Sequence, residues 1–190
     1  MATFTPHSVT GWRAAVDAFD EWADQALERV RGNRTADAAF SLASHLGDFS
    51  VLWHIVGTAR GLTSDRRANQ AIALSVVLGV ESLVVNQGVK RLFRRARPTE
   101  AGDERFPVRK PSTSSFPSGH ASSAFTAAAV LTSWGGARTA PFWFGLAAVV
   151  GVSRAYVRIH HASDIVGAVV GLAVGIAAAR LLRRCRSLAA

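Results

Sequence analysis

The apolar residues of this chain gather into five long segments from residue 36 onward, separated by polar stretches. These segments cover residues 38–62, 69–89, 120–134, 140–152 and 164–182. A helix that crosses a bilayer needs about 20 mostly apolar residues, and several of these segments reach that length only when their small polar flanks are counted. Their repetition predicts an all-α integral membrane bundle of about five transmembrane helices over residues 36–190. Buried helices of a soluble α-bundle are the alternative.

Residues 9–33 have a different pattern, in which apolar positions recur among charged ones. The apolar side chains fall three to five positions apart, at Trp12, Val16, Phe19, Trp22 and Leu27. This spacing is typical of an amphipathic helix, and the charges between these residues make the segment too polar to span a bilayer. We therefore expect residues 1–35 to form an N-terminal amphipathic helix that lies on the membrane surface or packs on the rest of the fold.

Two further features of the pattern concern packing and connection. Gly167, Gly171 and Gly175 follow one another at four-residue steps, so in a helix they share one face and let a neighbouring backbone approach closely. The long polar connection, residues 98–117, is rich in Pro, Ser and charge. Connections of this length are usually functional or disordered.

The composition favours a membrane partner. Hydrophobic residues make up 49% of the 190 residues and charged residues 18%, and the net charge of +9 is carried almost wholly by arginine. The arginines lie at the edges of the apolar segments and are not interleaved with aromatic residues, which argues against nucleic acid as a partner. Because Cys185 is the only cysteine, a disulfide framework and a thiolate metal site are excluded.

Three polar clusters lie at the ends of apolar segments, at residues 90–98, 116–123 and 153–164. If the helices alternate in direction, the end of the second, the start of the third and the connection from the fourth to the fifth lie at the same membrane face. The topology alone therefore predicts that the three clusters meet in one site.

The cations of these clusters suit a phosphate group. Lys90, Arg97 and Arg154 lie in the first and third clusters, and three cations around one site match a dianionic tetrahedral group, with the arginine forks giving bidentate hydrogen bonds. For the other arginines of the first cluster we expect contact with lipid headgroups. These are Arg91, Arg94 and Arg95.

The second cluster places an anion site at a helix start. Pro117 and Gly119 predict a tight turn, and the free backbone N–H groups at a helix N-terminus attract an anion. Ser118 adds a hydroxyl donor, and His120 lies one residue into the helix, beside the anion. A helix cap alone would explain Ser118 and Gly119 but not His120.

The third cluster pairs histidine with a carboxylate. On a helix, His160 and Asp164 share a face, so the carboxylate accepts one imidazole N–H and leaves the other ring nitrogen free as nucleophile or base. His161, three residues before Asp164, competes for this role on spacing alone. The whole set suits phosphoryl transfer through a phosphohistidine with a second histidine as general acid. A metal site is disfavoured among so many cations.

The three clusters resemble the signature of the type 2 phosphatidic acid phosphatase superfamily, which also contains the vanadium haloperoxidases. A lysine, six residues and Arg-Pro match Lys90 through Pro98, Pro-Ser-Gly-His matches 117–120, and Ser-Arg, five residues, His, three residues and Asp match 153–164. The match covers about 75 residues in order and spacing. Many membrane members have six spans, whereas residues 9–33 here are too charged to form one.

The resemblance implies a role for each matched residue. His160 is implied to be the nucleophile, oriented by Asp164, and His120 the acid that protonates the leaving oxygen and then the base that activates water. The resemblance assigns phosphate binding to five residues, and it implies neither a metal nor another cofactor. The five are Lys90, Arg97, Ser118, Gly119 and Arg154. His161 is out of register with the family pattern.

The expected function is metal-independent hydrolysis of a lipid phosphate or diphosphate, because a site at the membrane face favours an amphiphile with its headgroup at that level. The candidate substrates are polyprenyl phosphates and diphosphates, polyprenyl-linked phosphosugars such as decaprenylphosphoryl-phosphoribose, phosphatidylglycerol phosphate and phosphatidic acid. A vanadate-dependent haloperoxidase and a catalytically silent lipid-binding membrane protein are the alternatives.

The charge distribution predicts the orientation. Arginines gather at the face opposite the site, and the positive-inside rule makes that face cytoplasmic. They are Arg60, Arg66, Arg67, Arg138, Arg180, Arg183, Arg184 and Arg186. We therefore expect a multi-pass protein of the bacterial cell membrane with its site on the extracytoplasmic face.

Overall fold

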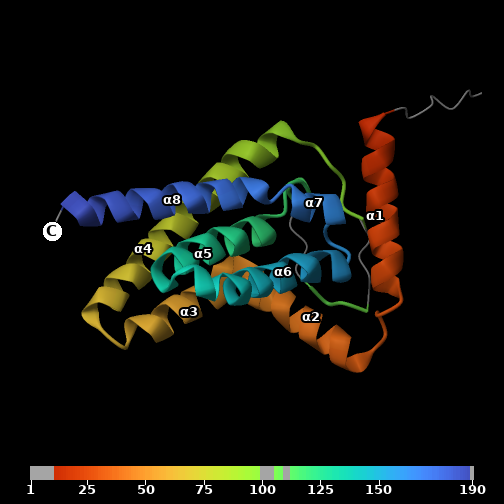
Figure 1. Ribbon diagram of the computed structural model, residues 1–190. Coiled ribbons are helices and arrows are strands. Elements are labelled where there is room, and N and C mark those ends of the chain that lie inside the picture. The colour runs from red at the N-terminus through yellow and green to blue at the C-terminus, as the bar shows by residue number, and fades with distance from the viewer. Residues whose placement is uncertain (1–10, 99–104, 109–111, 189–190) are drawn as a thin grey trace, which may run out of the picture.

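The computed structural model describes residues 11–98, 105–108 and 112–188, which form helices and loops with no strand among them (Figure 1). The α-helices are α1 (Trp12–Glu28), α2 (Arg34–Gly47), α3 (Val51–Gly61), α4 (Asp65–Ser82), α5 (Gly119–Gly135), α6 (Ala140–Tyr156), α7 (Ala162–Val166) and α8 (Val169–Leu188). The shorter helices are η1 (Asp48–Ser50), η2 (Leu83–Gly88), η3 (Val89–Leu92) and η4 (Ala137–Thr139). The predicted all-α class is confirmed.

The first apolar segment, 38–62, is a broken helix rather than a continuous one. Phe49 and Ser50 have left-handed backbone with φ of 50° and 59°, a conformation that ends a right-handed helix. The chain therefore continues as α3 in a new direction. The break places Asp48 at the bend between α2 and α3.

The helix that continues from α4 through η3 presents an apolar face outward. Four apolar residues on this face recur at three- or four-residue steps and are more than half exposed; they are Ile72, Val76, Val80 and Leu83. A continuous exposed apolar face suits contact with lipid hydrocarbon. By length and hydropathy, two helices of the described part qualify as membrane spans, Asp65–Leu92 and Ala162–Cys185.

The helices that contain the predicted spans 120–134 and 140–152 are short for a bilayer. α5 and α6 have 17 residues each, which gives about 26 Å at 1.5 Å per residue, slightly less than the roughly 30 Å hydrocarbon core. α5 runs through the centre of the bundle and packs against α4, α6 and α8. Its buried alanines let neighbouring helices approach closely.

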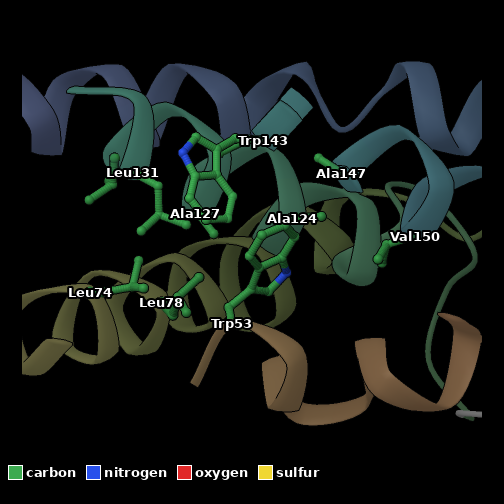
Figure 2. Packing of buried hydrophobic residues seen from close by; sticks show 11 residues of the cluster. Trp53, Leu74, Leu78, Ala124, Ala127, Leu131, Trp143, Ala147 and Val150 are labelled. Carbon is green, nitrogen blue, oxygen red and sulfur yellow. The ribbon is translucent and has the colours of Figure 1, made fainter. Parts of the chain in front are cut away.

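The main core surrounds α5 (Figure 2). Trp53 of α3 and Leu74 and Leu78 of α4 reach it from one side, and Trp143 of α6 packs into the same cluster. The remaining buried members are small or branched apolar residues. They are Ala124, Ala127, Ala128, Val130, Leu131, Ala147 and Val150.

The glycines of the last segment make the close contacts that their spacing predicts. A Cβ atom added at Gly171 would lie 2.2 Å from the Ser122 backbone oxygen, and one at Gly175 would lie 2.8 Å from the Thr126 Cα. Thr126 also donates a hydrogen bond to the Gly171 carbonyl at 2.7 Å. α8 is therefore held against α5 by backbone contact. A Cβ at Gly167 would instead meet the Phe116 ring at 2.3 Å.

The amphipathic helix predicted over 9–33 spans Trp12–Glu28, and residues 9 and 10 lie outside the described part. α1 runs across the end of the bundle where α6 ends and α7 begins (Figure 1). Its polar face packs on the fold, where Asp24 pairs with Arg31 at 2.7 Å and with Arg158 at 3.0 Å. Trp12 and Trp22 point away and are 71% and 66% exposed.

Candidate active site

The three polar clusters meet at one cavity of about 1130 Å³. The end of η3, the loop that follows it, the start of α5 and the α6–α7 loop all contribute to its wall. The predicted residues in the wall are Lys90, Arg97, Gly119, His120 and His160. The other three predicted residues, Ser118, Arg154 and Asp164, are buried. The convergence expected from alternating helix directions is thus confirmed.

The start of α5 has the tight turn that the sequence predicted. Ser118 is the N-cap, and its hydroxyl accepts the N–H of Ala121 at 3.4 Å. Its own N–H donates to the Asp164 carbonyl at 3.0 Å, which ties the second cluster to the third. A Cβ at Gly119 would lie 3.1 Å from the Asn86 side-chain oxygen. A glycine therefore keeps this helix end close to η2.

The His160–Asp164 contact is present, but its structural basis differs from the predicted one. His160 lies in the loop before α7, which begins at Ala162, so the two residues do not share a continuous helix. The His160 Nδ1 is 3.3 Å from the Asp164 Oδ2. His161 is the N-cap of α7, and its backbone N–H donates to the same oxygen at 2.8 Å. The Asp164 carboxylate thus faces the His160 ring and the backbone N–H of His161.

The neighbours of His160 assign its tautomer. The Arg97 guanidinium lies 3.2 Å from Nε2, and because a guanidinium only donates hydrogen bonds, Nε2 is the acceptor. The proton is therefore on Nδ1, where Asp164 accepts it. Burial lowers the pKa of His160 to about 3, although the hydrogen bond to Asp164 opposes this shift. His160 is therefore neutral near pH 7, and its Nε2 lone pair accepts a hydrogen bond from Arg97, which lines the cavity beside it.

The three predicted cations lie in or near this part of the site. Lys90 and Arg97 line the cavity, and Arg154 interacts electrostatically with His160. Arg97 is held by carbonyl oxygens, because its guanidinium donates to Ile159 at 2.7 Å and to Thr113 at 3.1 Å. The Arg154 guanidinium donates to the Ser44 carbonyl at 3.2 Å and to the Ser44 hydroxyl.

Arg154 keeps unused donors. It is 1% exposed, and its Nε and second terminal nitrogen are buried without a hydrogen-bond partner in the described part of the chain. Buried guanidinium N–H groups without partners are costly, and an anionic group would satisfy them. This observation fits the predicted phosphate site.

The structure adds to the site a carboxylate that the motifs miss. Asp48 lies at the bend between α2 and α3, and its Oδ1 is 2.8 Å from the His120 Nε2. A Cβ at Gly47 would lie 2.6 Å from the His120 ring, so the glycine permits this approach. The available signal in the sequence was a carboxylate within an apolar segment, where an ionisable residue is costly and usually functional.

One arginine expected at the lipid headgroups lies elsewhere. Arg95 donates to the Asp164 Oδ1 at 2.6 Å and to the Asp20 Oδ2 at 2.5 Å. The expectation was wrong for Arg95 because two buried carboxylates compete for its guanidinium more strongly than the membrane surface does. Arg91 is exposed and donates to the Gln87 side chain at 2.6 Å.

Comparison with known proteins places this site in a family. The sequence model of the PAP2 superfamily matches residues 70–187. The chain is 37% identical over 125 residues to the decaprenylphosphoryl-5-phosphoribose phosphatase of Mycolicibacterium smegmatis, a match that covers 65% of this chain and 66% of that protein. It is 33% identical over 133 residues to the protein of the same name from Mycobacterium tuberculosis, with coverage of 70% and 72%.

Two solved structures have a similar fold. One is a transmembrane PAP2 type phosphatidylglycerolphosphate phosphatase from Bacillus subtilis, with a TM-score of 0.66, 24% identity and coverage of 91% of this chain and 87% of the other. The other is LpxE from Aquifex aeolicus, with a TM-score of 0.66, 24% identity and coverage of 87% and 95%.

The chain belongs to the PAP2 superfamily, as its three motifs predicted. The fold it shares with a transmembrane phosphatase confirms the predicted helical bundle, and two of its helices qualify as membrane spans by length and hydropathy. The prediction of a lipid phosphatase is confirmed at the level of the family, since the relatives are phosphatases named for lipid-linked substrates.

Proposed function

We propose that this chain is a metal-independent phosphatase that removes a phosphate group from a membrane lipid through a phosphohistidine on His160. The observation that carries the proposal is the setting of the His160 imidazole. The residue lines the cavity, its Nδ1 lies 3.3 Å from the Asp164 Oδ2, and its Nε2 lies 3.2 Å from the Arg97 guanidinium, which a bound phosphate group would attract away from the nitrogen. A desolvated, unprotonated nitrogen with a fixed tautomer is what nucleophilic attack on phosphorus requires.

In the proposed reaction we assign each bond change to a residue of the site. The Nε2 lone pair of His160 attacks phosphorus, and the bond from phosphorus to the lipid oxygen breaks. His120 donates a proton to that oxygen, and the lipid alcohol leaves. His120 then takes a proton from water, the resulting hydroxide attacks phosphorus, and the phosphorus–nitrogen bond breaks to release inorganic phosphate. Asp164 stabilises the positive imidazole while the phosphoryl group is attached.

Phosphate binding falls to the cations and the helix start. Lys90 and Arg97 lie in the cavity wall, and Arg154 offers its unpartnered donors. Ser118 and Gly119 supply the N-terminal end of α5, where free N–H groups favour an anion. Preorganised donors of this kind stabilise the charge that spreads over the phosphoryl oxygens in the transition state.

Among the candidate substrates we favour a polyprenyl-linked phosphosugar. Two relatives are named for such a substrate, and the cavity is larger than a phosphate group requires. Its wall also carries neutral polar side chains that suit sugar hydroxyl groups. These include Ser82, Asn86, Gln87, Ser112 and Ser114.

We also propose that the chain lies in the bacterial cell membrane with the cavity on the extracytoplasmic side. Residues 36–190 would form the membrane phosphatase domain, and α1 of the N-terminal segment would lie at the membrane interface. The end of the bundle opposite the cavity holds the α3–α4 and α5–α6 connections (Figure 1), where Arg66, Arg67 and Arg138 lie. The positive-inside rule supports this orientation.

The test measures the release of inorganic phosphate from a panel of lipid phosphates, in detergent and in the presence of EDTA. It compares the wild type with His160→Ala and His161→Ala. His161 is the matched control, because it is adjacent to His160 and the Asp164 carboxylate accepts its backbone N–H, which alanine retains. We expect metal-independent turnover that His160→Ala abolishes and His161→Ala retains. Full activity of His160→Ala, or a strict need for a divalent ion, would contradict the proposal.

The same preparation separates the alternatives. Vanadate is expected to inhibit phosphate release without supporting bromination. Bromination that depends on vanadate would indicate a haloperoxidase, and binding of lipid phosphates without release of phosphate would indicate a silent lipid-binding protein.

A further inference from the structure

A second layer of charge lies behind the His160–Asp164 pair, on the side where α1 packs. The Arg95 guanidinium donates from one terminal nitrogen to the Asp164 Oδ1 at 2.6 Å, and from the other to the Asp20 Oδ2 at 2.5 Å. Asp164 is fully buried and Asp20 is 8% exposed. One guanidinium therefore joins the N-terminal helix to the carboxylate that faces the proposed nucleophile.

Asp20 also holds the helix that carries Asp164. Its Oδ1 accepts the backbone N–H of Ser163 at 2.8 Å, and its Oδ2 accepts the Ser163 hydroxyl at 2.7 Å. Ser163 precedes Asp164 in the first turn of α7. Asp20 thus restrains Asp164 by two routes, through the main chain of α7 and through Arg95.

Arg95 is fixed along its whole length. Its backbone N–H donates to the Ser114 hydroxyl at 3.2 Å, and its carbonyl accepts the N–H of Ser115 at 3.0 Å. Two residues on, Arg97 reaches the His160 Nε2. The same short segment therefore places one arginine at the histidine and another at its carboxylate.

We propose that Asp20 and Arg95 are positioning residues for phosphoryl transfer, an inference that rests on the proposed function of His160. By binding Oδ1 of Asp164, Arg95 turns Oδ2 toward the His160 Nδ1 proton and keeps the carboxylate ionised. That charge and orientation matter most when the imidazole becomes positive during attack on phosphorus. The effect of losing them therefore falls on the chemical step rather than on substrate binding.

The test compares Asp20→Asn with Asp24→Asn in steady-state kinetics, on the lipid phosphate that the wild type hydrolyses fastest. Asp24 is a matched control, because it lies one turn further along α1 and also pairs with arginines, Arg31 and Arg158. For Asp20→Asn we expect kcat to fall about 10- to 100-fold, since small misplacements of reacting groups have effects of this size, while KM stays within about twofold. Asp24→Asn is expected to keep kcat within about twofold.

Substitutions of Arg95 sharpen the test. Arg95→Ala should lower kcat at least as much as Asp20→Asn. The loss in the double variant should be smaller than the product of the two separate losses, as for coupled residues, because the two side chains share one of the routes to Asp164. Arg95→Lys keeps the charge but not the planar fork, so we expect partial recovery. It also serves as the milder variant if Asp20→Asn is not monodisperse.

Four outcomes would overturn the inference. Equal losses of kcat in Asp20→Asn and Asp24→Asn would mean that both substitutions act only by weakening the packing of α1 against the bundle. A large rise in KM at constant kcat would assign Asp20 or Arg95 to substrate binding. Strictly additive losses of kcat in the double variant would show that Asp20 and Arg95 act independently of each other. If the wild type is active, His160→Ala is inactive and Asp20→Asn keeps full activity, this inference alone is rejected. If His160→Ala keeps full activity, the proposed function itself is rejected.

Discussion

The site contains two histidines that each face a carboxylate, and the two pairs are built differently. His160 and Asp164 lie four residues apart, and Asp164 is held further by Arg95 and by the N–H of His161. His120 and Asp48 lie 72 residues apart, on two elements that meet only in the folded bundle. The first carboxylate is fully buried, whereas the Asp48 side chain is 21% exposed.

The difference in burial and in hydrogen bonding of the two carboxylates matches the different chemical roles proposed for the two histidines. A histidine nucleophile needs one fixed tautomer and a neighbouring carboxylate that stays ionised. Asp164 meets this need because it is buried and held by several hydrogen bonds. A group that first donates and then accepts a proton needs a partner that tolerates both protonation states, and partial exposure favours this. The comparison therefore predicts unequal sensitivity of the two pairs to substitution.

The largest expected effect is at the first pair. We expect His160→Ala to lower kcat by about 10⁴-fold or more, because no phosphoenzyme forms without the nucleophile. Asp164→Asn should lower it by about 10³-fold, since an amide in place of the carboxylate permits the wrong tautomer. Phosphate release under saturating substrate measures both effects, and an Asp164→Asn enzyme with wild-type kcat would remove the distinction between the pairs.

The effect of substituting His120, in the pair His120–Asp48, should depend on the leaving group of the substrate. With an alkyl phosphate we expect His120→Ala to lower the rate of phosphoenzyme formation by about 10²- to 10⁴-fold, because the leaving oxygen needs a proton. With an aryl phosphate, whose leaving group departs unprotonated, the loss in this step should shrink to about tenfold. Single-turnover kinetics with the two esters provide the comparison. An equal loss with both esters would contradict the assignment of His120 as the acid.

A smaller effect is expected at Asp48, which acts through His120. Asp48→Asn keeps a hydrogen-bond acceptor near His120 Nε2 but removes the charge, so we expect kcat to fall about 10- to 100-fold for alkyl phosphates. Ser50→Ala, in the same bend, is a matched control because Ser50 also lines the cavity. Equal losses in the two variants would show that the bend, and not the carboxylate, supports His120.

The smallest expected change is the response of His160 to acid. Its lowered pKa means that protonation, which would block attack, occurs only far below the usual histidine value of about 6.5. As pH falls from about 8 to 5, the nucleophile therefore stays neutral and available. Nitrogen NMR of labelled histidine in detergent, with the signal assigned by its loss in His160→Ala, should show no titration in this range. A midpoint near 6.5 would contradict the burial argument.

Local patterns were sufficient to predict much of this molecule. The three motifs, the glycine face of α8 and the turn at Ser118 depend on residues a few positions apart, and alternating helix directions then bring the motifs together. The His160–Asp164 contact was predicted on the premise of a shared helix, yet it forms across the start of α7. The spacing was sufficient even though the local conformation differed.

Contacts between distant segments could not be predicted in this way. Asp48 reaches His120 only because Phe49 and Ser50 take left-handed backbone, a conformation that nothing in their residue types requires. Arg95 reaches Asp20 because α1 docks across the end of the bundle, and the amphipathic pattern left open whether this helix packs on the protein or lies on the membrane. Both contacts depend on tertiary arrangement rather than on local sequence.

The central claim is that the phosphoryl group passes through His160, and trapping the intermediate tests it most directly. His120→Ala, given an aryl phosphate, should form the phosphoenzyme but hydrolyse it slowly, because the base that activates water is missing. Peptide mass spectrometry under alkaline conditions, which preserve phosphohistidine, should then place one phosphoryl group on His160 and none on His161. A phosphoryl group on another residue, or turnover of the aryl phosphate without any phosphoenzyme, would contradict the account.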